Sequence, residues 1–128
     1  MSKIVVIDFE TTGLSPGLGD RATEVAAVII DDNKIIDRFQ SLMNAGVAIP
    51  AYIQQLTGIS NAMLRKAPPC QNVMRELADF IGDRPLVAHN ASFDTRFLDA
   101  EWSRIHYKRS QSFACSMLLT VAIIPLMS

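Results

Sequence analysis

The sequence predicts an α/β fold in which a mixed β-sheet is flanked by helices. Three short runs rich in β-branched residues stand together near the N-terminus, at 4–9, 22–31 and 34–43, as neighbouring strands would. Segments with apolar residues at helical spacing follow only after residue 50. Strands first and helices later are typical of a mixed sheet covered by helices.

Length and composition predict one domain over residues 1–128. The chain is 49% hydrophobic and 20% charged, without internal repeats or an obvious linker. Its formal net charge of −1 excludes a strongly basic nucleic-acid binder, so any nucleic-acid contact must be local or helped by metal ions. Cys70 and Cys115 lack the spacing of a zinc site or disulfide framework. With no signal peptide pattern or membrane span, we expect a cytoplasmic protein.

The first half of the chain reads as three strands. The run IVVIDF at 4–9 ends at Thr-Thr-Gly, which predicts a buried strand followed by a turn, and 13–20 is a loop by its Gly, Pro and Ser content. Asp32-Asn33 is a two-residue turn of the hairpin kind. We therefore expect 22–31 and 34–43 to pair antiparallel, next to the first strand.

Two helices are expected next. Pro50 can open a helix and Gly58 can close one, so a short helix is predicted at about 50–57. After Pro68-Pro69, apolar residues recur at helical spacing up to the terminator Gly82, at Val73, Leu77, Phe80 and Ile81.

The remaining elements are a strand, a helix and a second strand. Residues 85–89 form a short apolar run that ends at polar residues, as a strand with functional groups at its tip would. From Ser92 to Tyr107 the spacing predicts a helix with one apolar side, made of Phe93, Phe97, Leu98 and Trp102. Residues 111–118 are expected to form a strand and the start of a further element.

Asp8 and Glu10 end the first apolar run two residues apart. On a strand that spacing puts both side chains on one face, where two carboxylates repel each other unless a cation lies between them. A hard divalent cation such as Mg²⁺ or Mn²⁺ prefers such oxygen ligands. The alternative is that Asp8 caps the following turn and Glu10 is exposed at the strand end.

A second acidic group follows the later strand. That strand ends at His89-Asn90, and Asp94 comes near the start of the next helix. A carboxylate there can simply complement the helix dipole. Two strands of one sheet can also bring their tips into one cleft, in which case Asp8, Glu10 and Asp94 form a metal site.

These segments resemble a known family. Residues 8–13, DFETTG, resemble the first motif of the DEDD exonuclease superfamily, and 87–94, VAHNASFD, resemble its second. Between them, IPAYIQQLTGIS at 49–60 resembles a segment of the proofreading epsilon-type subunit of bacterial replicative DNA polymerase. The resemblance covers roughly residues 3–118.

The resemblance implies a ribonuclease H-like fold and a metal-dependent 3'-5' exonuclease that acts on single-stranded DNA ends. Asp8, Glu10 and Asp94 would be catalytic and would hold a pair of Mg²⁺ or Mn²⁺ ions. The implied substrate-binding residues are Thr11, Thr12, Gly13, Leu56, Thr57, Gly58, His89, Asn90 and Phe93. Leu56, Thr57 and Gly58 would line the pocket for the terminal base and 3'-hydroxyl, whereas Phe93 is expected to pack beneath the site, because apolar residues at helical spacing usually face inward.

The third motif of the family, His-x-Ala-x-x-Asp, does not occur in this sequence. No Asp or Glu follows Glu101, and neither His89 nor His106 occupies the required place. His106, among Arg104, Lys108 and Arg109, reads as a surface side chain. The apolar ending over 119–128 suggests truncation, by a frameshift for example, so we expect an incomplete domain with exposed apolar surface and a tendency to form homodimers.

The loss of a general base and a ligand predicts weak metal occupancy and impaired hydrolysis. Two other functions stay open. One is a catalytically defective module that binds nucleic acid or a polymerase. The other is an exonuclease that trims RNA ends, although no residue in the sequence is an evident contact for a 2'-hydroxyl.

Overall fold

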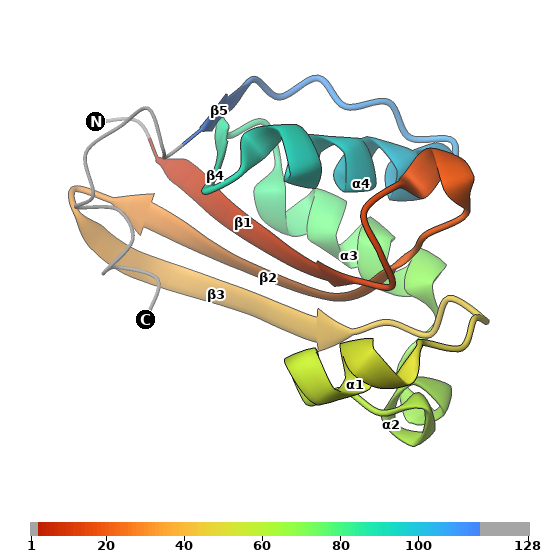
Figure 1. Cartoon of the computed structure of the whole chain (residues 1–128). Helices are drawn as coiled ribbons and strands as arrows, with labels where there is room; N and C mark the ends of the chain where they lie inside the picture. The colour runs from red at the N-terminus through yellow and green to blue at the C-terminus, as the bar shows by residue number, and fades with distance from the viewer. Residues whose placement is uncertain (1–2, 116–128) are drawn as a thin grey trace.

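The computed structural model describes residues 3–115 (Figure 1). Its strands are β1 (Ile4–Thr11), β2 (Ala22–Asp31), β3 (Lys34–Leu42), β4 (Leu86–Ala88) and β5 (Phe113–Cys115). Its helices are the short 3-10 helix η1 (Pro16–Leu18) and the α-helices α1 (Ala51–Thr57), α2 (Asn61–Lys66), α3 (Cys70–Ile81) and α4 (Ala91–Ser103). The part of the predicted strand after residue 115, and the further element expected to follow it, lie outside the described residues.

The five strands form one mixed sheet in the order β3-β2-β1-β4-β5. β1, β2 and β3 pair antiparallel, whereas β4 is parallel to β1 and β5 is parallel to β4. The hairpin turn between β2 and β3 has positive φ at both Asp32 (51°) and Asn33 (62°), which is the conformation that a two-residue hairpin turn requires. The predicted mixed sheet with three antiparallel first strands is therefore confirmed.

The main core lies between the sheet and the helices α3 and α4, which cover one of its faces in Figure 1. Alternate side chains of β1 serve the two faces of the sheet. Val5, Ile7 and Phe9 are buried in the core under the helices, and Val6 belongs to a smaller apolar cluster with Val28, Ile30 and Val87. By the same alternation, Asp8 and Glu10 lie on the face of Val6.

Two predicted boundaries differ from the structure by two residues or more, and one α-helix was missed. The last helix ends at Ser103 rather than at Tyr107, because the chain turns back at His106, which has a φ of 60°. β1 continues past residue 9 to Thr11. The missed helix α2 has six residues and is capped by Ser60, whose hydroxyl accepts a hydrogen bond from the Met63 amide at 3.1 Å. A helix this short carries little periodicity, and its cap is its main signal.

One buried ion pair fastens α4 to the sheet. Glu101 is 2% exposed and accepts hydrogen bonds from Arg21 Nε and Nη2, both at 2.9 Å, and from the Ala22 amide at 3.0 Å. The Cys70 thiol, 3.3 Å away, donates a further bond. Although burial raises the pKa of Glu101, the hydrogen bonds from Arg21 and Ala22 outweigh it and lower that pKa.

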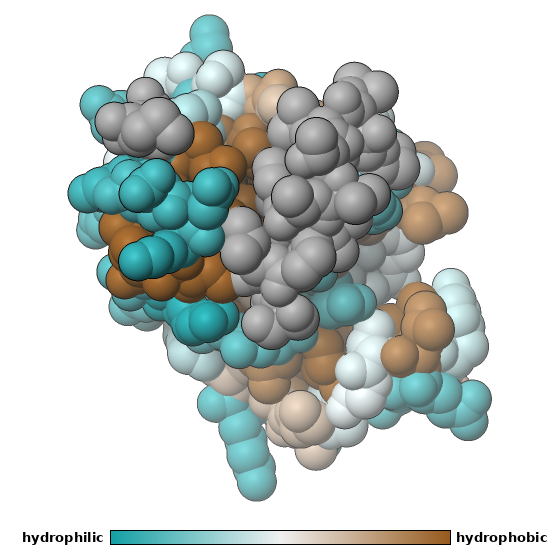
Figure 2. Space-filling view, turned by 90° about the vertical axis from the view of Figure 1, so that its left-hand side faces the viewer, coloured by the Kyte–Doolittle hydropathy of each residue, from teal (hydrophilic) through white to brown (hydrophobic). Residues whose placement is uncertain are grey.

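Polar residues dominate much of the described surface on the side drawn in Figure 2, and apolar residues appear there in separate patches. Within residues 3–115, no helix combines the length and apolar character needed to cross a membrane.

The Glu101 ion pair generates a stability prediction. Glu101→Ala leaves the half-buried Arg21 and the buried Ala22 amide without their acceptor, so we expect the free energy of unfolding at neutral pH to fall by about 3 kcal/mol. Because the folded pKa of Glu101 is lowered, its contribution is present above the ordinary carboxyl pKa and is lost as the pH falls through the folded value.

Urea denaturation at neutral and acidic pH measures this effect. Asp99→Ala is the matched control on the same helix, because it removes an exposed pair with Arg109 and should cost less than about 1 kcal/mol. Equal losses in the two variants would contradict the special role of Glu101.

Candidate active site

β1 carries Asp8 and Glu10 on one face, as predicted from their spacing. The pairing of β1 with β2 is regular through this stretch and shifts only between Glu10 and Thr11. It places Ala26 opposite Asp8 and Glu24 directly opposite Glu10. Because paired residues of antiparallel strands point to the same face, Glu24 is a third carboxylate beside the predicted two.

α4 brings Asp94 to the same place. Asp94 lies in the first turn of α4 and is 3% exposed, and its Oδ1 accepts a hydrogen bond from the amide of Phe9 at 3.2 Å. Phe9 stands between Asp8 and Glu10 in β1. The structure therefore joins residues 85 positions apart in sequence and brings the second-motif carboxylate beside the first-motif pair.

The carboxylates raise one another's pKa. The pKa of Asp94 is raised to about 7, mainly by burial and further by the negative charges of Asp8 and Glu10. Partial burial is also the main cause of the raised pKa values of Asp8 and Glu10, and the charge of Glu24 raises both further. His89 acts in the opposite direction and lowers the pKa of Asp8.

The donor set fits a hard divalent cation. All candidate ligands are carboxylate oxygens, and no Lys or Arg of residues 3–115 forms an ion pair with Asp8, Glu10 or Asp94. In the same part of the chain, no three His, Cys, Asp or Glu side chains are gathered closely enough to hold an ion. Metal binding at this place therefore requires the side chains to turn toward the ion.

The Thr-Thr-Gly turn after β1 is held by Asp20. The carboxylate of Asp20 accepts hydrogen bonds from the Thr12 hydroxyl at 3.0 Å and from the Ser15 amide at 3.1 Å. A Cβ atom on Gly13 would lie 2.5 Å from the Asp20 carboxylate, so a larger residue there would displace that carboxylate from its hydrogen bonds. The hydroxyl of Thr11 donates to the Gly13 carbonyl at 2.6 Å, and both threonines are buried.

Leu56, Thr57 and Gly58 form the end of α1. Gly58 has a φ of 76° and donates its amide to the Gln54 carbonyl at 2.9 Å, which closes the helix as predicted. The Thr57 hydroxyl donates to the Ile53 carbonyl at 2.8 Å, and Leu56 is 79% exposed. Within the described residues, no hydrogen bond links this segment to the carboxylates, so its part in the site remains a prediction.

The tip of β4 carries the other predicted residues. His89 and Asn90 are exposed between β4 and α4, and Asn90 makes no side-chain cap for the helix. Phe93 is half-buried, with its ring 4.9 Å from that of the fully buried Phe97. The expected inward packing of both rings is confirmed. His106 is exposed beyond α4, as predicted for a surface side chain.

Sequence reasoning missed Glu24 and Asp20. The Asp32-Asn33 turn sets only β2 against β3, whereas the register of β1 against β2 decides that Glu24 faces Glu10. Asp20 appeared only as one residue of a polar loop. Its role depends on two hydrogen bonds of its side chain, which a periodic sequence pattern does not predict.

Comparison with known proteins identifies relatives over most of the chain. The RNase_T exonuclease family model matches residues 5–128. The 3'-5' exonuclease DinG of Bacillus subtilis (strain 168) is 40% identical over 121 residues, which are 94% of this chain and 13% of that protein. The PolC-type DNA polymerase III of the same strain is 45% identical over 101 residues, or 79% and 7%. The chain thus spans a small part of these relatives' length.

Solved structures share the fold at low sequence identity. Exonuclease I in its apo form has a TM-score of 0.81 and 17% identity, over 97% of this chain and 31% of that one. The zinc-bound complex of E. coli ExoI with ssDNA has a TM-score of 0.80 and 17% identity, over 91% and 28%. The predicted ribonuclease H-like fold is therefore confirmed.

The raised pKa of Asp94 generates a pH prediction for the protein without metal. A carboxyl whose pKa is about 7 when folded and 3.8 when unfolded stabilises the fold below the lower value, and this contribution is lost as the pH rises through the upper one. Asp94→Asn keeps an oxygen for the Phe9 amide and carries no charge. The variant should therefore become more stable than the wild type as the pH rises.

Thermal unfolding in EDTA at pH values from about 5 to about 8 checks this difference. Asp79→Asn, an exposed change on α3, is the control and should follow the wild type. A constant difference between Asp94→Asn and the wild type across this range would contradict the buried, charged state of Asp94.

Proposed function

The chain belongs to the exonuclease family whose model matches residues 5–128, and on this basis we propose that it is a metal-dependent 3'-5' exonuclease. Its substrate would be the 3' end of single-stranded DNA, and its products nucleoside monophosphates. The observation that carries the proposal is the hydrogen bond from Phe9 to Asp94, which brings the carboxylate of the second motif beside Asp8 and Glu10.

Asp8, Glu10 and Asp94 are the proposed catalytic residues and the proposed ligands of Mg²⁺ or Mn²⁺. Divalent cations bound there supply electrostatic stabilisation of the charge that develops during phosphodiester hydrolysis. The mutual repulsion of these carboxylates supports this role, because a cation would relieve it. Asp8 and Glu10 belong to β1, the central strand of the sheet, so their backbone positions are fixed before substrate binds.

The Thr11–Gly13 turn is proposed to lie along the terminal nucleotide. The hydrogen bonds of Asp20 hold the turn, and its carboxylate fills the space beside Gly13 that a side chain would need. Leu56, Thr57 and Gly58 are proposed to line the pocket for the terminal base and 3'-hydroxyl. His89, Asn90 and Phe93, which follow strand β4, are proposed to bind the substrate as well. The large exposed area of Leu56 supports such a contact with a base.

The sequence lacks the third-motif histidine and aspartate, so we propose that these 128 residues bind metal weakly and hydrolyse DNA slowly. A catalytically defective module that binds nucleic-acid ends is the second candidate, and the absence of acidic residues after Glu101 favours it. Partnership with a DNA polymerase in proofreading is proposed from the PolC-type relatives. A cytoplasmic location and a homodimer are proposed as well.

An exonuclease assay tests the proposal. With Mn²⁺ and a single-stranded oligonucleotide labelled at its 5' end, we expect slow shortening from the 3' end, about 10²–10⁴-fold below the rate of a relative that has a general base. Asp8→Asn should remove this activity, whereas Asp79→Asn should retain it.

The alternatives give different results in the same experiment. Binding of the oligonucleotide without any shortening favours the defective binding module, and faster shortening of a matched RNA favours an RNA-trimming enzyme. Shortening that persists unchanged in Asp8→Asn would contradict the proposed active site. Fast, Asp8-dependent shortening would contradict only the proposed impairment.

A further inference from the structure

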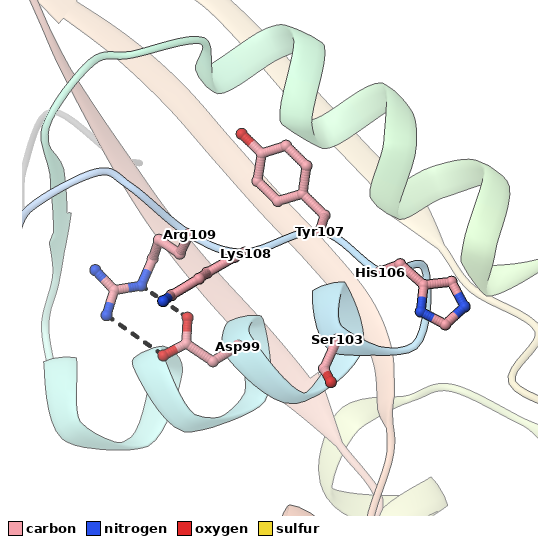
Figure 3. Close-up of a pocket in the computed structure, with 6 residues that line it drawn as sticks. All are labelled: Asp99, Ser103, His106, Tyr107, Lys108 and Arg109. Atoms are coloured by element: carbon pink, nitrogen blue, oxygen red, sulfur yellow. Dashed lines mark hydrogen bonds and ion pairs between the residues drawn. The ribbon is translucent and has the colours of Figure 1, made fainter.

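The side chains around the cavity drawn in Figure 3, of about 550 Å³, do not converge on one point. Lys108 and His106 point to opposite ends of it, and the ring of Tyr107 turns toward α3. Arg109 is held by Asp99, with Nε 2.7 Å from Oδ1. The cavity therefore marks where the segment after α4 is fastened back onto that helix. Uncompensated charge gathers instead at the carboxylates of the proposed active site.

Glu24 faces those carboxylates from the neighbouring strand. It is half-buried and stands directly opposite Glu10 in the register of β1 and β2, and Asp8 lies one residue pair away on the same face of β1. Directly opposite residues of antiparallel strands have Cβ atoms about 4.5–5.5 Å apart. Two glutamate side chains at that spacing can both reach one small cation between the strands.

The negative charge of Glu24 adds to the repulsion at this place. No Lys or Arg of residues 3–115 forms an ion pair with Glu24, and its charge raises the pKa of both Asp8 and Glu10. A carboxylate that only repels its neighbours costs stability. A bound cation reverses the sign of this interaction, because each carboxylate is then attracted to the ion between them.

Gln40 holds Glu24 without neutralising it. Gln40 stands opposite Ala26 on β3, which places it on the same face of the sheet, and its Nε2 donates a hydrogen bond to Oε2 of Glu24 at 3.1 Å. A side-chain amide is an uncharged donor. The carboxylate of Glu24 is thus oriented by a neighbour and keeps its full charge for a cation.

We propose that Glu24 is a fourth carboxylate of the metal site, beside Asp8, Glu10 and Asp94. This inference rests on the proposed metal-dependent function. Three carboxylates leave one charge of a pair of divalent cations uncompensated, and Glu24 supplies the charge that is missing. Because the sequence lacks the acidic residue of the third motif, β2 would take over from that motif the supply of a further carboxylate.

Titration with Mn²⁺ alone, followed by electron paramagnetic resonance of the free ion, tests the proposal without any turnover. Glu24→Gln keeps an oxygen for the Gln40 amide and removes the charge, so we expect it to weaken Mn²⁺ binding by about 10–100-fold. Asp8→Asn should weaken binding as well. Glu76→Gln is the matched control, because it is the same change at an exposed position of α3 and should bind as the wild type does.

Thermal unfolding gives a second readout of the same variants. In EDTA at neutral pH, Glu24→Gln should be more stable than the wild type, because one repelling charge is gone, and saturating Mn²⁺ should raise its Tm by less than that of the wild type. Glu76→Gln should follow the wild type in both conditions.

The outcomes separate this role from the proposed function. Unchanged Mn²⁺ binding in Glu24→Gln, with weakened binding in Asp8→Asn, would overturn the role of Glu24 and leave the proposed function intact. Lower stability of Glu24→Gln than of the wild type in EDTA would also overturn it, because Glu24 would then serve the fold. Unchanged binding in both variants, or no binding by the wild type, would contradict the metal site itself and the role of Glu24 with it.

Discussion

The attachment of α4 to the first strands is the constraint on which the site depends. Two carboxylates of this helix, Asp94 and Glu101, are seven residues apart and therefore lie on the same side. Asp94 accepts a hydrogen bond from the Phe9 amide, and Glu101 accepts hydrogen bonds from the Arg21 side chain and the Ala22 amide. Both contacts reach backbone atoms of the β1–β2 unit, so the helix cannot slide without losing both.

The two contacts differ in how their charge is compensated. Glu101 meets a guanidinium, which lowers its pKa, whereas Asp94 is buried beside other carboxylates, and both the burial and their charges raise its pKa. One end of the helix is thus a stabilising anchor, and the other stores electrostatic repulsion. This division is expected where a fold supports a charged site, because the stable anchor offsets the cost of the unstable cluster.

Much of this arrangement could be predicted from the sequence, for identifiable physical reasons. The spacing of Asp8 and Glu10 fixes their common face, and Asp32-Asn33 fixes a hairpin, because both are local effects. The end of α4 was placed four residues too late, since nothing periodic marks the turn at His106. Glu24 and Asp20 depend on strand register and on a loop closed by side chains, which a local pattern does not encode.

The sheet order also has a consequence for how the protein folds. β1, β2 and β3 are consecutive neighbours, so they can form a meander from local contacts, whereas β4 pairs with β1 across about eighty residues. Contacts between distant segments carry the larger loop-closure cost and tend to form late. Because the carboxylates of the candidate site come from both sides of this division, the site would exist only in the last stage of folding, after the C-terminal half has docked on the meander.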